Sequence, residues 1–126
     1  MFGAEIRFEP PPPDLWRFGL PENEAVPLAL VINELGTNAI KHRSTRDQAV
    51  RVHVASRPEG MEFAIENPGQ LPPGFSLADI AASVSGLGLV KALLPRRGAR
   101  LSIEASGATV LARLQLFPPA VREENV

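Results

Sequence analysis

The chain of 126 residues contains no cysteine. This absence excludes disulfides, thiolate metal sites and cysteine nucleophiles, and it fits a cytoplasmic protein. Long apolar runs are missing too, since none approaches the roughly 20 residues that span a bilayer, and residues 1–9 lack the basic start and apolar core of a signal peptide. We therefore expect a cytoplasmic domain, whether or not a longer parent protein is anchored in a membrane.

A strong net charge is also absent, because 13 basic residues face 14 acidic ones and the formal net charge is -1. No overall field draws the protein onto nucleic acid, so we expect no nucleic-acid partner and a local site for any bound anion. Apolar residues make up 44% of the chain, which is typical of a globular protein. The length suits one domain, which we place at residues 1–119, with residues 120–126 as a flexible tail.

Hydrophobic spacing predicts an α+β fold. Residues 5–9 alternate as a strand does and end at four prolines, whereas residues 22–43 carry an apolar stripe of helical period. Pro27 is unusual inside that helix and favours a later start, near residue 25 or 26. A hairpin, a loop with one short helix, a second helix and a second hairpin are expected at residues 50–65, 70–85, 85–94 and 100–117. This order predicts a two-layer sandwich of a mostly antiparallel sheet and helices.

Three polar side chains share one face of the first predicted helix. Glu34, Asn38 and Lys41 fall within about 60° of each other, about a quarter turn from the apolar stripe. A carboxylate, an amide oxygen and a cation are the groups that a magnesium-bound triphosphate requires. On an arbitrary helix, however, such a row is usually an incidental solvated face. The spacing alone leaves both explanations open.

The amino-acid sequence of this segment is more specific than the spacing of its three polar residues. Residues 33–42, Asn-Glu-Leu-Gly-Thr-Asn-Ala-Ile-Lys-His, resemble the N box of GHKL-type (Bergerat-fold) ATPases, especially sensor histidine kinases. Residues 65–72 resemble the first glycine box of that superfamily, which receives adenine, and residues 85–90 resemble the second, which cradles phosphate. Residues 107–110 are similar to the strand motif that closes the adenine pocket. The resemblance extends from about residue 5 to residue 118.

The resemblance implies ATP and Mg²⁺ as cofactors and a role for each matched residue. Asn38 would bind the metal, Glu34 would orient or deprotonate the attacking group, and Lys41 would contact phosphates. Backbone amides at a helix N-terminus attract anions, which agrees with phosphate at the second glycine box. The implied cofactor-binding residues are Asn38, Lys41, His42, Asn67, Gly69, Gly86, Leu87, Gly88 and Thr109, and the implied catalytic residues are Glu34 and Lys41.

The first glycine box departs from the family pattern. Asn67 stands where the family has Asp, and Leu71 stands where it has a second Gly. An Asn oxygen can still accept a hydrogen bond from the adenine amino group, and its nitrogen can donate to a ring nitrogen. A plain turn at Asn-Pro-Gly is the alternative. Glu66 is expected to point to the opposite face of its strand.

As a function, the resemblance implies a histidine kinase catalytic domain that phosphorylates a histidine on a separate dimerisation domain and, through it, acts on a response regulator. His42 and His53 lack the sequence context of a phosphoacceptor, so the isolated domain is expected to be monomeric and inactive as an autokinase. Two alternatives stay open. One is a stand-alone nucleotide-dependent binding module or serine kinase of the anti-sigma-factor type, and the other is a degenerate nucleotide binder.

Overall fold

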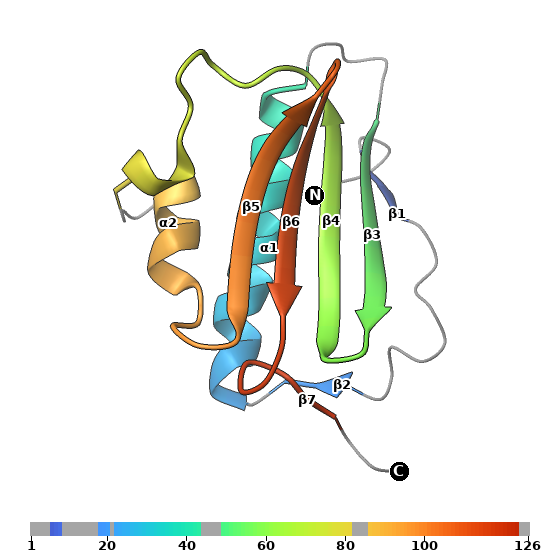
Figure 1. Ribbon diagram of the computed structural model, residues 1–126, viewed down its shortest axis with the longest axis vertical. Helices are drawn as coiled ribbons and strands as arrows, with labels where there is room; N and C mark the ends of the chain where they lie inside the picture. The colour runs from blue at the N-terminus through green and yellow to red at the C-terminus, as the bar shows by residue number, and fades with distance from the viewer. Residues whose placement is uncertain (1–5, 9–17, 21, 44–48, 82–85, 124–126) are drawn as a thin grey trace.

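A five-stranded sheet with helices on one face forms the centre of the computed structural model, which describes residues 6–8, 18–20, 22–43, 49–81 and 86–123 (Figure 1). Every neighbouring pair of strands is antiparallel except the first pair in the sheet, which is parallel. In spatial order the strands are β1 (Ile6–Phe8), β3 (Val50–Arg57), β4 (Gly60–Pro68), β6 (Thr109–Leu116) and β5 (Ala99–Ser106). The predicted α+β sandwich with a mostly antiparallel sheet is therefore confirmed.

Two tight turns connect the predicted hairpins. Pro58 and Glu59 join β3 to β4, and because no described non-glycine residue has a positive φ, this turn is of an unprimed type that suits proline at its first central position. Gly107 and Ala108 join β5 to β6, with Gly107 at φ +61°. A positive φ at the first central residue alone is the pattern of a type II′ hairpin turn, which favours glycine there. Both hairpins form where the sequence predicts them.

Helix α1 (Glu22–Lys41) packs its apolar stripe against the sheet. Leu28, Val31 and Leu35 are each at most 2% exposed. Pro27 lies inside the helix, so the later start that it favours is not observed. Proline removes one backbone donor near the helix start, and the burial of the following turns offsets that loss.

A second helix lies beside α1 at the edge of the sheet (Figure 1). Helix α2 (Gly86–Leu93) buries Gly88 and Val90, and Val90 joins the same core as Leu35 of α1. Between β4 and α2 the described residues 69–81 arch over one end of the sheet and include a single 3-10 turn, η3 (Leu77–Asp79), where a short helix is predicted. The remaining residues of that predicted loop, 82–85, lie outside the described part of the chain.

The chain stays packed beyond residue 119, so the predicted boundary there is wrong. Ala120 and Val121 are 2% and 0% exposed, because a turn from Phe117 O to Ala120 N (2.9 Å) directs the chain back into the core. The next two residues form β7 (Arg122–Glu123), which pairs with β2 (Phe18–Gly19). Of the predicted tail, only residues 124–126 remain, and they lie outside the described residues. No helix in the described part is long and apolar enough to span a membrane.

Candidate functional site

A cavity opens at one end of the sheet. Figure 1 shows that α1 and β4 end there and that β6 begins there. The cavity has a volume of about 160 Å³. The lining combines polar groups from α1 and β4 with an otherwise mainly apolar wall, and consists of Asn38, His42, Asn67, Gln70, Leu71, Pro72, Phe75, Leu87, Ile103 and Val110. The cavity thus joins four regions that are separate in the sequence, which are residues 38–42, 67–75, 87 and 103–110.

Four of the residues proposed from the sequence line this cavity: Asn38, His42, Asn67 and Leu87. The other proposed residues are not part of its lining, although each is a described residue next to one that is, or within a turn of it. They are Glu34, Lys41, Gly69, Gly86, Gly88 and Thr109. The structure therefore brings the N box, the first glycine box and the second glycine box to one place without putting every predicted residue in the wall.

The polar row on α1 is presented as the helical period predicts. Glu34 and Asn38 are half-buried and one turn apart, whereas Lys41 is exposed at the last residue of the helix. His42 follows the helix, and its backbone N–H donates to Asn38 O over 3.0 Å, which continues the helical pattern by one residue. Buried Leu35 and Ala39, on the adjacent apolar face of the helix, fix it in the core. The packing of α1 therefore fixes the position of the polar row relative to the end of the sheet.

Asn67 is a buried polar residue whose orientation is set by the backbone carbonyl of the next residue, Pro68. The side chain is 5% exposed, and its Nδ2 donates to Pro68 O over 3.1 Å. A carbonyl oxygen only accepts, so the amide nitrogen must face it and Oδ1 must point the other way. Among the described residues, no hydrogen bond to Oδ1 is found. An acceptor thus remains available on a residue that lines the cavity.

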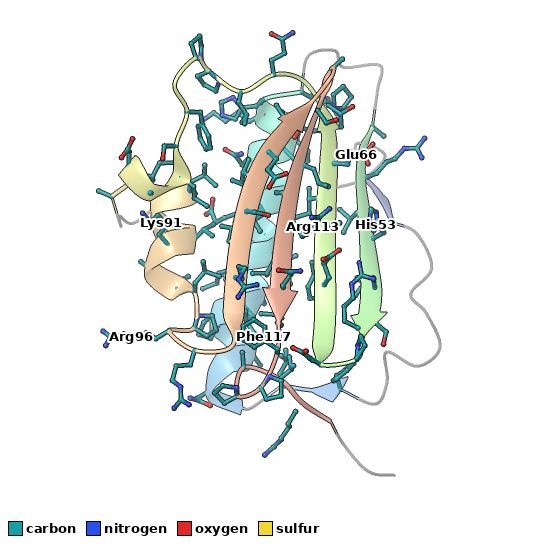
Figure 2. All side chains as sticks on the ribbon, in the orientation of Figure 1. His53, Glu66, Lys91, Arg96, Arg113 and Phe117 are labelled. Carbon is teal, nitrogen blue, oxygen red and sulfur yellow. The ribbon has the colours of Figure 1, made fainter. Side chains whose placement is uncertain are left out.

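Glu66 faces away from this cavity, as predicted. It pairs in the sheet with Arg51 and Leu111, one register step from the Asn67 and Val110 pair, so its side chain lies on the opposite face. Figure 2 shows Glu66 with His53 and Arg113 on the sheet face that α1 does not cover. These three residues are therefore separated from the cavity by the sheet itself.

Glycines shape both ends of the segment between β4 and α2. The N–H of Gly69 donates to Ala108 O over 2.8 Å, which ties the end of β4 to the turn before β6. Gly86 begins α2 with φ +60°, and a Cβ placed there would meet nothing within 4 Å. Backbone conformation rather than crowding therefore favours glycine at position 86.

The residues predicted from the sequence do not include those of the apolar wall of the cavity. Phe75, Ile103 and Val110 all line it. Phe75 is the one aromatic residue in the Pro- and Gly-rich stretch of residues 70–85, which is a signal that could have been used. Ile103 and Val110 follow from the alternation of β5 and β6, which turns them to the helix-covered face.

A larger cavity of about 300 Å³ lies at the opposite end of the sheet, beside the β3–β4 turn. Its wall adjoins Glu62, which is 5% exposed and accepts from Arg57 Nη2 at 3.1 Å and Gln115 Nε2 at 3.2 Å. Arg113 Nε is 3.6 Å from Glu62, which is an ion pair but too long for a hydrogen bond. Arg57 and Gln115 therefore supply hydrogen-bond donors to the buried Glu62 carboxylate from within the protein. We assign the candidate site to the smaller cavity because it holds the motif residues.

Comparison with solved structures identifies the fold. The ATP-binding domain of PrrB from Mycobacterium tuberculosis superposes with a TM-score of 0.64 at 23% sequence identity, covering 91% of this chain and 80% of that one. This chain has the fold of histidine kinase ATP-binding domains. The GHKL fold that the motifs imply is therefore confirmed.

Two further histidine kinase structures agree on the fold. The catalytic domain of histidine kinase ThkA gives a TM-score of 0.58 at 13% identity, covering 73% of this chain and 66% of that one. The histidine kinase domain of the blue-light activated kinase EL346 from Erythrobacter litoralis gives 0.58 at 20% identity, covering 76% and 48%. The chain thus spans less than two thirds of each of these two. No sequence-family profile and no curated protein matches it.

Proposed function

We propose that this chain is the ATP- and Mg²⁺-binding catalytic domain of a two-component sensor histidine kinase, which transfers the γ-phosphoryl group of ATP to a histidine on a separate dimerisation domain. The observation that carries the proposal is the single cavity shared by Asn38, Asn67 and Leu87. These residues belong to three motifs that the sequence separates by 29 and 20 positions, from 38 to 67 and from 67 to 87. A histidine kinase fold at low sequence identity supports the same assignment.

The cavity suits the base of a nucleotide better than a whole nucleotide. At about 160 Å³ it is smaller than the roughly 300–1,000 Å³ of typical ligand sites, and its apolar wall from Phe75, Ile103 and Val110 fits a flat heterocycle. Asn67 Oδ1 would accept from the adenine amino group, since its amide nitrogen is turned to Pro68 O. The phosphates would then extend towards the start of α2 at Gly86.

Asn38 is the residue that would hold magnesium. The described residues contain no group of three or more His, Asp or Glu side chains that could form a protein cage. Magnesium does not need one, because it usually takes one or two protein ligands and completes its octahedron with phosphate and water. A half-buried amide oxygen in the cavity wall fits that requirement. Bound magnesium would supply charge neutralisation on the phosphates.

The remaining polar groups would position the reacting atoms. In the transfer, the bond from the γ-phosphorus to the bridging oxygen breaks, ADP leaves, and a bond to an imidazole nitrogen forms. Glu34, one turn before Asn38, would orient that imidazole and accept its proton, while exposed Lys41 and His42 would contact phosphate oxygens. Phosphoryl transfer depends mainly on such positioning and on charge neutralisation.

A second candidate function is a nucleotide-dependent binding module of the anti-sigma-factor type. It is favoured by one observation, which is that Gln70, Leu71, Pro72 and Phe75 form part of the cavity wall. Their positions would change with occupancy, and so would the outer surface of this segment. Capture of a protein partner only in the presence of ATP, without phosphorylation of any histidine, would support this candidate over the kinase.

Calorimetry with a non-hydrolysable ATP analogue tests the proposal. Asn38→Ala should abolish the dependence of binding on magnesium and leave the melting temperature nearly unchanged, because the side chain lies on the polar face of α1. The matched control is Asn33→Ala on the same helix, which is outside the cavity lining and should keep the dependence. Absence of binding heat at millimolar analogue with the unaltered chain would exclude both candidate functions.

A further inference from the structure

Lys91 makes two hydrogen bonds that link α2 to the segment between β4 and α2, and none of the roles proposed above uses them. Its Nζ donates to Leu77 O over 3.1 Å and to Ala78 O over 3.3 Å. These acceptors belong to η3, whereas Lys91 lies on α2, 14 and 13 positions later. Figure 2 shows Lys91 on α2 next to the segment that carries η3. We call these two hydrogen bonds the Lys91 bridge.

The bridge connects two walls of the candidate site. Lys91 follows the cavity residue Leu87 by four positions on α2, so the two share a helix face. Leu77 follows the cavity residue Phe75 by two positions. An ammonium group that holds η3 against α2 therefore also fixes how far Phe75 lies from Leu87.

The chemistry of the acceptors suits an ammonium group. Within the described backbone, Leu77 O accepts a backbone hydrogen bond only from Ile80 N, at 3.2 Å, so it retains a free lone pair. Each backbone carbonyl oxygen is an acceptor with two lone pairs, which suits an ammonium donor. Lys91 has three donors and is half-buried, and its Nζ lies within hydrogen-bond distance of both oxygens.

We propose that Lys91 is a positioning residue, which holds residues 70–81 against α2 and thereby sets the shape of the base-binding cavity. This inference rests on the proposed nucleotide function for its effect on affinity, but the bridge itself does not depend on that function. Because Lys91 acts through the wall at Phe75, its loss should weaken adenosine and ATP by the same factor. A direct phosphate contact would instead weaken ATP alone.

The bridge can be tested without any nucleotide, because the chain has only two lysines, Lys41 and Lys91. Under limiting acetic anhydride, followed by mass spectrometry, exposed Lys41 should be acetylated at least about fivefold faster than Lys91. Brief thermolysin treatment should cut between Phe75 and Ile80 faster in Lys91→Met than in the unaltered chain. Equal acetylation of the two lysines together with unchanged cleavage would overturn the bridge.

Affinity tests the positioning role. Calorimetry should show Lys91→Met binding adenosine and magnesium-ATP about five- to tenfold more weakly, which corresponds to the loss of one anchoring interaction. Lys91→Arg should restore most of the affinity, and the exposed-cation control Arg97→Met should match the unaltered chain. Unchanged affinity in Lys91→Met, or a loss confined to ATP, would overturn the role. An unaltered chain that binds no nucleotide would refute the proposed function, while acetylation and cleavage would still decide the bridge.

Discussion

At the scale of single residues, Asn67 determines how this site would differ from the family pattern. Its amide oxygen is a neutral acceptor, whereas the carboxylate usual at this position is a charged one, and charged hydrogen bonds are roughly twice as strong. The amide has a compensating advantage, because Nδ2 donates to Pro68 O. A carboxylate cannot donate that bond. Under the proposed function, asparagine at this position would lower the affinity for adenine and stabilise the chain without nucleotide.

Asn67→Asp should separate these two effects. We expect adenosine to bind about five- to tenfold more tightly, because the acceptor becomes charged, and the free energy of unfolding to fall by about 1–3 kcal/mol, because a buried donor is lost and a carboxylate faces a carbonyl. Calorimetry and urea denaturation measure the two quantities. Asn67→Ala serves as the control that loses the acceptor altogether. Unchanged affinity in Asn67→Asp would place the base elsewhere.

At the scale of elements, local patterns were sufficient for the hairpins but not for the pair formed by β2 and β7. Strands β3 and β4 each run for eight or more residues with alternating character and are joined by a Pro-Glu turn, so the signal is complete within 19 residues, from 50 to 68. Strands β2 and β7 have two residues each and pair over more than 100 positions. Two residues show no period, and this distant pairing leaves no local trace. For this reason the end of the domain was predicted too early.

Val121 provides a test of that corrected boundary. Val121→Ser should lower the free energy of unfolding by about 2–3 kcal/mol, because it removes methyl groups and buries a hydroxyl at a position that is 0% exposed. The neighbouring control Arg122→Ser is exposed and should change stability by less than about 0.5 kcal/mol. Urea denaturation compares the two. Equal stabilities would mean that the packed domain ends at residue 119 after all.

At the scale of the whole molecule, the sheet separates the candidate site from one of the two histidines. His53 lies on the outer face with Arg113, whereas the cavity lies at the end of the helix-covered side (Figure 2). His42 lines the cavity from the end of α1, on the same segment as the proposed magnesium ligand. If the proposed kinase function holds, the phosphoacceptor would be a histidine of another domain, since neither His42 nor His53 is placed to approach the cavity from outside.

The isolated chain should accordingly not phosphorylate itself. After incubation with magnesium and ATP, intact-mass spectrometry at neutral pH should show no added phosphate, and calorimetry on the same preparation should show that ATP binds. Acid-labile phosphate on His42 or His53 would contradict the requirement for a separate acceptor domain. Acid-stable phosphate on a serine of an added partner would instead favour the anti-sigma-factor type of kinase.

Some residues of the site belong to local sequence motifs and could be predicted, whereas others depend on the folded path of the chain and could not. Asn38 and Asn67 belong to short, recognisable sequence motifs, and the structure places both in one cavity. Phe75 and Lys91 act through the path of residues 70–81, which only the folded chain defines. Long-range contacts of this kind depend on tertiary packing, so neither composition nor periodicity indicates them.

The parallel pairing of β1 with β3 has a consequence for folding. Ile6 pairs with Val50, 44 positions later, and α1 lies between them, whereas both hairpins close over turns of two residues. Loop-closure entropy makes distant pairings slow, so the hairpins are expected to form early and β1 to join the edge of the sheet late. Until then β3 presents an open edge. Strand β1, which is synthesised before the other strands of the sheet, would therefore be the last of them to become native.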